Sequence, residues 1–476
     1  MARTQRDHRT PVLFALILSM ALVAMDTTIV ATAIPQVVDD LGGFSQVGWV
    51  FSVYLLAQTV TIPIYGKLAD LYGRKPILVI GVIVFLVGSL LSASAWNMVA
   101  LIAFRALQGI GAGSIGATVN TVAGDLYSVQ ERGRIQGYLS SVWGIAAVVA
   151  PAIGGLFAQY ASWRWIFLVN LPIGAIALFL IVRLLHEDVV RRKHRIDYAG
   201  AGLVLVSTGL LILGLLQGGT SWAWLSPASF VTFALAIVAG AAAIWVERHA
   251  TEPMLPMWLW TKRVNVGSYA ATLTAGLMVI GLSVYLPNWA QTVLGLSPVA
   301  AGFVLAVMSM TWPTASGLSA RLYLRIGFRN TALIGSGFAI ASGVVFTLMG
   351  PQAQVWQPIV GSALMGAGMG LIVAPLLVGL QSTVGWSQRG TITGGAMFSR
   401  FLGQSLGAAV FGAVTNTVLR QQHGQSQSAA MSASTHAVFI GLLLAAVATA
   451  LILALVVPRH FPSIATTSQP NVEPAG

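Results

Sequence analysis

Fourteen apolar runs, each about as long as a lipid bilayer is thick, follow one another along this chain. A helix needs roughly 20 mostly apolar residues to cross about 30 Å of hydrocarbon. The runs lie near 11–34, 46–66, 76–95, 97–122, 136–157, 164–185, 197–216, 225–246, 265–290, 298–320, 328–350, 356–381, 391–418 and 436–457. Only 8% of the 476 residues are charged, too few to cover a water-facing surface. We therefore predict an all-α integral membrane protein with 14 membrane helices.

Basic residues are unevenly distributed between the segments that join these runs. If the chain begins in the cytoplasm, 21 of its 25 Lys and Arg residues fall on the cytoplasmic side. This bias is the positive-inside signal of membrane proteins, and it places both termini in the cytoplasm. It also explains the net charge of +12 without nucleic-acid binding. The excess of arginine over lysine, with abundant glycine and alanine, favours a bacterial protein of the inner (cytoplasmic) membrane.

Several classes of chemistry have no support in the sequence. The chain contains no cysteine, and none of its seven histidines stands at ligand spacing from another, so we expect no metal site and no cofactor. A G-x-x-x-x-G-K-[ST] sequence for nucleotide binding is absent from the sequence. No nucleophile, base and orienting residue occur together. Catalysis and nucleotide-driven transport are therefore not expected.

A degenerate internal repeat indicates the domain organisation. Gly317 and Arg325 follow the tenth run as Gly66 and Arg74 follow the second. Parallel six-helix repeats describe one large transporter architecture. We predict a six-plus-two-plus-six arrangement with a flexible outer loop at 421–435. Its parts are an N-terminal half (11–185), a linker carrying two additional helices (186–264), a C-terminal half (265–457) and a disordered cytoplasmic tail (458–476).

Several segments resemble a known transporter family. Residues 66–75 are similar to the cytoplasmic loop signature of the major facilitator superfamily. Residues 24–35 resemble the first-helix motif of its fourteen-helix drug:proton antiporters, and 105–109 and 163–172 are further matches. The resemblance covers nearly the whole chain. It implies the major facilitator fold, alternating access and multidrug efflux coupled to protons.

Asp26 and Arg105 are charges inside predicted spans. Asp26 is the only carboxylate deep in any of these runs, and such a group is a functional candidate by default. Burial favours the protonated form of a carboxyl group, so we predict that Asp26 takes up and releases protons. The family resemblance places both residues at the central cavity, where Arg105 would influence that protonation. The alternative is a structural role for each: a cap or paired charge for Asp26, and a hydrogen-bonding link between helices for Arg105.

The loop signature has a mechanical interpretation. Gly66 and Gly73 permit close helix packing and a tight turn. Asp70 carries a negative charge, which is favoured near a helix N-terminus. The sequence therefore predicts a contact between this loop and the start of another helix.

The resemblance extends this contact to a latch between the two halves. It implies that the partner helix begins near 391–395, and that Arg74 bridges Asp70 to Asp125. The latch would close the cytoplasmic side in the outward-open state. The alternative, that the charges only fix topology, suits Lys75 better than Asp70.

The fifth run carries a softened form of the antiporter signature of the family. Pro151 supplies a bend, and Gly154 and Gly155 permit close packing. Ala146 and Ala150 stand where the signature has glycine.

Substrate contacts are the least constrained part of the prediction. Aromatic rings can bind flat lipophilic or cationic groups, although a packing role also fits each of them. Trp289, near an outer helix end, is expected in the interfacial aromatic belt. Arg400 either lies at cavity depth or binds backbone carbonyls. The candidate cavity residues are Tyr54, Gln58, Gln108, Asn120, Trp143, Tyr285, Trp312 and Arg400.

Secondary active efflux is the leading hypothesis for the function. A proton would enter through Asp26 as a small hydrophobic or amphipathic compound leaves. The same transport mechanism could instead export an endogenous lipid, siderophore or metabolite. A proton-coupled importer and a membrane sensor without transport are weaker alternatives. The expected partners are substrate, protons and the lipid bilayer, with a monomeric protein and no nucleic acid.

Overall fold

Helices make up almost all of the chain in the computed structural model. The structure describes residues 2–43, 46–187, 197–219, 221–250, 252–253, 255–350, 352–422 and 426–461, and none of these belongs to a β-strand. The helices over these ranges are α1 (Ala2–Leu41), α2 (Val47–Tyr72), α3 (Arg74–Ala93), α4 (Met98–Leu126), α5 (Val129–Tyr160), α6 (Trp165–Leu168), α7 (Asn170–Leu184), α8 (Tyr198–Gln217), α9 (Pro227–His249), α10 (Trp258–Thr261), α11 (Arg263–Thr292), α12 (Pro298–Ile326), α13 (Phe328–Leu348), α14 (Trp356–Ser382), α15 (Trp386–Gln421) and α16 (Gln427–Leu455).

The predicted membrane helices are confirmed. Within the described ranges, 14 helical segments are long and apolar enough to cross a bilayer, with α6 and α7 forming one of them. Peptide groups find no water in hydrocarbon, so a spanning segment must satisfy its own hydrogen bonds as a helix. Several helices extend beyond the apolar runs, because a helix continues through polar residues until a cap or turn ends it.

Polar residues at the caps set where many helices begin. Asn97 separates α3 from α4, and its side chain accepts a hydrogen bond of 2.7 Å from the backbone N–H of Ala100. Ser226 and Ser297 cap α9 and α12 in the same way, each followed by a proline at the first helical position. Both features are expected at helix starts.

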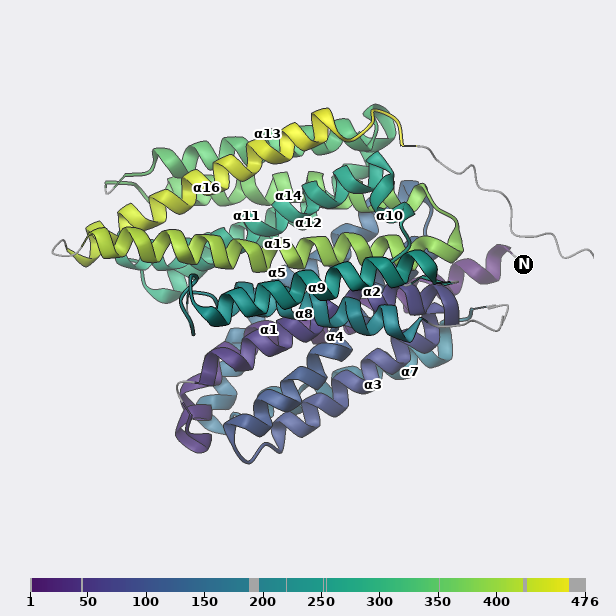
Figure 1. The fold of residues 1–476 in the computed structure, drawn as a ribbon, viewed down its shortest axis with the longest axis horizontal. Coiled ribbons are helices and arrows are strands. Elements are labelled where there is room, and N and C mark those ends of the chain that lie inside the picture. Colours follow the sequence, from purple (N-terminus) through teal and green to yellow (C-terminus); the bar gives the residue numbers. More distant parts are fainter. Residues whose placement is uncertain are drawn as a thin grey trace, which may run out of the picture.

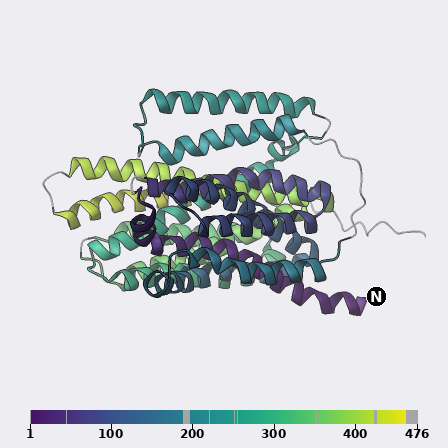
Figure 2. The same cartoon turned by 90° about the horizontal axis from the view of Figure 1, so that it is seen from below.

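The helices run side by side along the longest axis of the molecule (Figure 1). α1 begins and α16 ends at the same end of the bundle, as an even number of crossings requires. α8 and α9 pack on each other and lie at one side of the bundle (Figure 2), where α8 contacts α2 and α15. Ile237 and Trp245 on α9 are exposed, as expected for side chains that face lipid.

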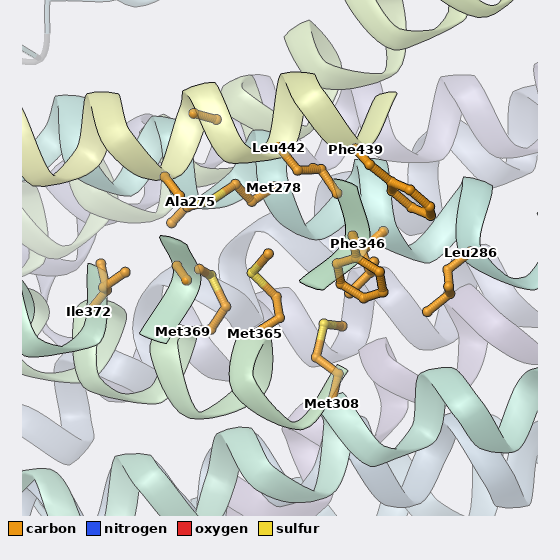
Figure 3. Packing of buried hydrophobic residues seen from close by; sticks show 14 of the residues in the cluster. Ala275, Met278, Leu286, Met308, Phe346, Met365, Met369, Ile372, Phe439 and Leu442 are labelled. Carbon is orange, nitrogen blue, oxygen red and sulfur yellow. The ribbon is translucent and has the colours of Figure 1, made fainter. Parts of the chain in front are cut away.

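Two large apolar cores lie in the two predicted halves. One is built from α1 to α5 together with α7, and the other from α11 to α16. The second contains a row of methionines, including Met278, Met365 and Met369, beside Phe346 and Phe439 (Figure 3). Methionine fills irregular gaps between helices without branching at Cβ. These two cores support the predicted division into halves, which stays a prediction.

The two halves meet mainly through two helix pairs, α2 with α15 and α5 with α12, with smaller contacts of α4 with α15 and of α5 with α14. In the second pair the Tyr323 hydroxyl accepts a hydrogen bond of 3.1 Å from the backbone N–H of Gly133 and donates one of 2.5 Å to the carbonyl of Val129. These residues lie at the end of the bundle that the basic residues assign to the cytoplasm. The halves are therefore joined at their cytoplasmic ends.

Three expectations about local structure are wrong. Residues 66–72 form the last turns of α2 rather than a loop, because nothing before Gly73 interrupts the helix. The outer loop expected at 421–435 is helical from Gln427 onward, where the Ser426 side chain caps α16. Trp289 is only 1% exposed and packs edge-to-face on Phe439, so it belongs to the core rather than to an interfacial belt. Residues 188–196 of the linker and 462–476 of the tail lie outside the described ranges.

The internal repeat has a different register from the one expected. Gly73 and Gly327 both adopt positive φ angles, of 97° and 84°, at the junctions between α2 and α3 and between α12 and α13. A residue with a Cβ rarely adopts this conformation. The turn that matches Gly73 is therefore at Gly327, three residues beyond the position that an alignment of Gly317 with Gly66 would give.

The orientation of the bundle can be tested with single cysteines, because the chain has none of its own. Gln130 and Trp96 are exposed at opposite ends of the N-terminal half. We expect a membrane-impermeant maleimide to label Gln130→Cys only in inverted vesicles and Trp96→Cys only in right-side-out vesicles. Labelling of both from one side would contradict the assigned topology.

Candidate functional site

A buried ion pair joins α1 and α4 in the middle of the N-terminal half. The side chains of Asp26 and Arg105 are 0% and 1% exposed. Arg105 Nη1 lies 2.5 Å from Asp26 Oδ2. A lone charge at this depth would cost several kcal/mol, so each side chain needs the other. The structure thus brings together the two intramembrane charges of the N-terminal half.

Amide and hydroxyl groups from three helices complete the surroundings of Asp26. Gln108 Nε2 donates a hydrogen bond of 2.8 Å to Asp26 Oδ1, and Asn170 Nδ2 lies 3.5 Å from the same oxygen. Ser89 Oγ accepts from both amides, at 3.3 and 3.0 Å. A buried ion pair is tolerated when such additional hydrogen bonds satisfy it. Ser89 was missed in the sequence, where a single serine in an apolar run gives little signal.

Arg105 has partners other than Asp26. Its Nη1 donates to Gln108 Oε1 at 2.8 Å and its Nε donates to the carbonyl of Val50 at 3.3 Å. The ring of Tyr54 lies over the guanidinium, 4.1 Å from Cζ to the ring centroid. Arg105 is therefore held by a carbonyl, an amide and an aromatic face in addition to the carboxylate.

Tyr54, Gln58 and Gln108 were candidates for contact with substrate. Each is at most 1% exposed. Tyr54 and Gln108 belong to the charged cluster described above. The Tyr54 hydroxyl and Gln58 Oε1 are buried and have no hydrogen-bond partner among the described residues.

A second charged cluster joins the halves where α15 begins. Asp70 Oδ1 accepts a hydrogen bond of 2.8 Å from the backbone N–H of Gly390, and its Oδ2 accepts from the Thr391 backbone N–H and hydroxyl, both at 2.7 Å. Gly390 and Thr391 are the fifth and sixth residues of α15, so their N–H groups lie near the positive end of the helix dipole, where a carboxylate is favoured. A Cβ on Gly66 would lie 2.6 Å from the Gly390 carbonyl oxygen, so glycine allows this approach.

Arginines extend this cluster to α4. Arg74 lies 3.0 Å from Asp70 and 2.8 Å from Asp125. Its guanidinium also donates to the Trp386 carbonyl and stacks on the Trp386 ring, 3.7 Å from the centroid. Arg389 pairs with Asp125 at 2.5 Å. The sequence pointed to Asp70, Arg74 and Asp125. It did not point to Trp386 and Arg389, because their place in the cluster depends on how α15 packs against α4.

Glu187 holds the same cluster by binding the backbone at the start of α3. Its two carboxylate oxygens accept hydrogen bonds of 2.8 and 2.9 Å from the backbone N–H groups of Arg74 and Lys75. These N–H groups open α3 and have no partner within that helix. Glu187 follows the last helix of the N-terminal half, so it ties the end of that half to the turn at Gly73.

The residues of the antiporter signature on α5 differ in their surroundings. A Cβ on Gly154 would lie 3.0 Å from the Ile29 carbonyl oxygen, so glycine allows α5 to pack closely on α1. A Cβ on Gly155 would meet nothing within 4 Å. Pro151 lies within α5, and its side chain is outside the described part of the structure.

Asn120 belongs to a polar seam between the halves. Its Oδ1 accepts from Gln136 at 3.3 Å and its Nδ2 lies 3.3 Å from the sulfur of Met397. Its backbone carbonyl accepts from Gln381 Nε2 at 3.1 Å. The structure therefore places Asn120 in contact with both α14 and α15.

The other candidate residues are half-buried. Trp143 packs against the core of the N-terminal half, and Tyr285 and Trp312 pack against that of the C-terminal half. Arg400 is partly exposed on α15, and its guanidinium lies over the ring of Phe401, 5.2 Å from the centroid.

Known proteins resemble this chain in sequence and in fold. The sequence profile of the Major Facilitator Superfamily matches residues 16–408. Multidrug resistance protein 3 of Bacillus subtilis is 35% identical over 86% of this chain and 80% of its own length. Multidrug transporter protein MdtP of the same organism is 34% identical, over 87% and 76%. The crystal structure of the human organic anion transporter MFSD10 has a TM-score of 0.67, with 15% identity, over 93% of this chain and 99% of its own.

The Asp70 cluster can be tested with a reporter between the halves. Ala117 is fully buried against Ile62 and Met397. In an Ala117→Cys background we expect Asp70→Asn to increase labelling from the cytoplasmic side severalfold, because the amide faces two N–H donors at a cost of about 1–3 kcal/mol. Asp40→Asn is the control, since it breaks the ion pair with Arg164 at the opposite end. Equal labelling of the Asp70→Asn and Asp40→Asn variants would contradict a latch role for the Asp70 cluster.

Proposed function

Because the chain belongs to the major facilitator superfamily and is a membrane transporter rather than an enzyme, we propose that it exports hydrophobic or amphipathic compounds in exchange for protons. The observation that carries this proposal is the buried pair of Asp26 and Arg105 in the middle of the membrane helices. The names of the two Bacillus relatives, a multidrug resistance protein and a multidrug transporter, support the class of substrate.

Proton exchange at Asp26 would proceed through two states of the cluster. In the first, the carboxylate accepts hydrogen bonds from Arg105 and Gln108. In the second, a proton neutralises Asp26, and Arg105 keeps Gln108 Oε1 and the Val50 carbonyl. The Coulomb attraction between α1 and α4 is present only in the first state. Protonation would therefore change the packing of these two helices, which is how a proton can bias a conformational equilibrium.

Alternating access requires the cytoplasmic contacts to open. The hydrogen bonds of Asp70 to Gly390 and Thr391, and those of Tyr323 to α5, cross between the halves. We assign this arrangement to the state that is closed toward the cytoplasm. Release of the Asp70 cluster would let the halves separate there and admit substrate from the cytoplasm or the inner leaflet.

The proposal includes the setting of the protein. It would act as a monomer in the cytoplasmic membrane of a bacterium, with small molecules and protons as its ligands. The positive-inside orientation and the bacterial relatives support this setting.

Dye efflux tests the role of Asp26. In energised cells we expect Asp26→Asn to abolish the efflux that depends on the proton gradient, because an amide cannot take up a proton. A protonophore should have the same effect on the wild-type protein. Asp26→Glu keeps the titratable group and should retain part of the efflux.

Two controls separate coupling from folding. Asp39→Asn changes an exposed carboxylate of α1 and should leave efflux intact. Removing Asp26 alone leaves Arg105 buried without its partner, at a cost of about 3–5 kcal/mol. Elution of each purified variant as a single species in size-exclusion chromatography is therefore required. Gradient-driven efflux by a folded Asp26→Asn protein would rule out the proton-carrier role.

A further inference from the structure

We propose that Arg400 of α15 binds the negatively charged group of the transported compound, which makes amphipathic organic anions a substrate class of this protein. This inference rests on the proposed export of amphipathic compounds. A carboxylate or a sulfonate fits the site best, because the planar fork of a guanidinium matches their paired oxygens.

Arg400 lies deep within a membrane helix. It follows the start of α15 at Trp386 by 14 residues, or about 20 Å at 1.5 Å per residue. It lies ten residues beyond Gly390, which marks the cytoplasmic contact with Asp70. Arginine keeps its charge in proteins and cannot escape burial by losing a proton. A charge at this depth needs an acceptor.

The structure provides no such acceptor among the described residues. The Nε of Arg400 is buried without a hydrogen-bond partner, and no carboxylate of the described chain pairs with its guanidinium. Several other arginines in the membrane helices have partners for their guanidinium groups, including Arg132 and Arg389, each of which leaves one nitrogen unpaired. Arg105 pairs with Asp26, Arg74 pairs with Asp70, and Arg329 donates to the carbonyls of Leu453 and Ala454. A structural arginine would resemble Arg329, and Arg400 does not.

The position of Arg400 on α15 turns it toward the other half. Met397 and Phe401, on either side of it, pack with Ile62 and Ala117 of the N-terminal half. Thr393, two turns before Arg400 on the same helix face, is buried and accepts a hydrogen bond from Gln381 of α14, whose amide nitrogen also donates to the Asn120 carbonyl of the N-terminal half. The side chain of Arg400 is partly exposed, whereas these neighbours are buried.

This combination defines the ligand that fits. The guanidinium offers donors for an anionic group, and the half-buried Tyr65 and Phe398 of the same apolar cluster offer contact for the rest of the molecule. Asp26 cannot serve as the counter-charge, because Arg105 and Gln108 already occupy its oxygens. The C-terminal half therefore presents an unpaired positive charge beside apolar side chains. An amphipathic anion would pair with the guanidinium and place its apolar part against these side chains.

The test compares two dyes that share a ring system and differ in charge. Fluorescein is anionic and rhodamine 123 is cationic at pH 7.5. Binding is measured by fluorescence polarisation with the purified protein in nanodiscs of phosphatidylcholine, which carries no net charge. We expect the wild-type protein to bind fluorescein, and Arg400→Gln to weaken that binding on the order of tenfold to a hundredfold while binding of rhodamine 123 does not fall.

Two further variants make the result specific. Arg400→Lys keeps the charge but loses the planar fork, so an intermediate affinity for fluorescein is expected. This variant tests the proposal even if Arg400→Gln does not fold. Arg134→Gln removes the same charge at an exposed position and should bind fluorescein like the wild type. Unchanged fluorescein binding by a folded Arg400→Gln protein would overturn the proposal. A wild-type protein that binds rhodamine 123 but not fluorescein would do so as well.

The binding measurement needs no gradient, so it is separate from the efflux experiment. Loss of fluorescein binding in Arg400→Gln supports anion recognition whether or not Asp26→Asn impairs efflux. Conversely, proton-coupled efflux of cationic dyes alone would leave the proposed function standing and remove the role of Arg400.

Discussion

Hydrogen bonding in the absence of water governs the architecture of this protein. Peptide groups that face hydrocarbon must find partners within their own segment, which only helices and closed barrels achieve. The described chain follows this constraint with 14 spanning helices, and side chains such as Asn97 and Ser297 cap the helix ends at the turns. Lipid is as apolar as the side chains that face it, so packing between helices depends on shape. The close contact of α2 with α15 at Gly66 is one result.

The same constraint applies to charge. Asp26 and Asp70 are both buried, and each is held by one arginine together with amide or backbone N–H donors. The first cluster lies within the N-terminal half, and the second joins the two halves. The first can therefore stay intact when the halves separate, whereas the second must break. Arg400 differs because no carboxylate of the described chain pairs with it, and an anionic ligand would supply the missing counter-charge.

The contacts between the halves follow an approximate repeat. Gly73 and Gly327 hold the same unusual backbone conformation at equivalent turns, and the helices before them, α2 and α12, each cross to the other half. Both turns are flanked by arginines, but only the turn at Gly73 has a carboxylate, Asp70, that binds the other half. Asp70 binds the start of α15, while α12 contacts α5 through the Tyr323 hydroxyl and through close packing at Gly133 and Gly137. One cytoplasmic contact thus includes buried charge, and the other combines a hydroxyl with close helix packing.

The sequence by itself determined the number of spans, the residues that cannot be left unpaired in lipid, and the family. Apolar length and charge are properties of single segments, so Asp26 and Arg105 stand out without any knowledge of packing. Only the tertiary structure decided which groups meet them. The stacking of Tyr54 on Arg105, the pairing of Arg389 with Asp125 and the burial of Trp289 depend on how helices far apart in the chain are rotated toward each other. That rotation is set by side-chain packing across several helices, and an apolar run looks the same in sequence whether it faces lipid or protein.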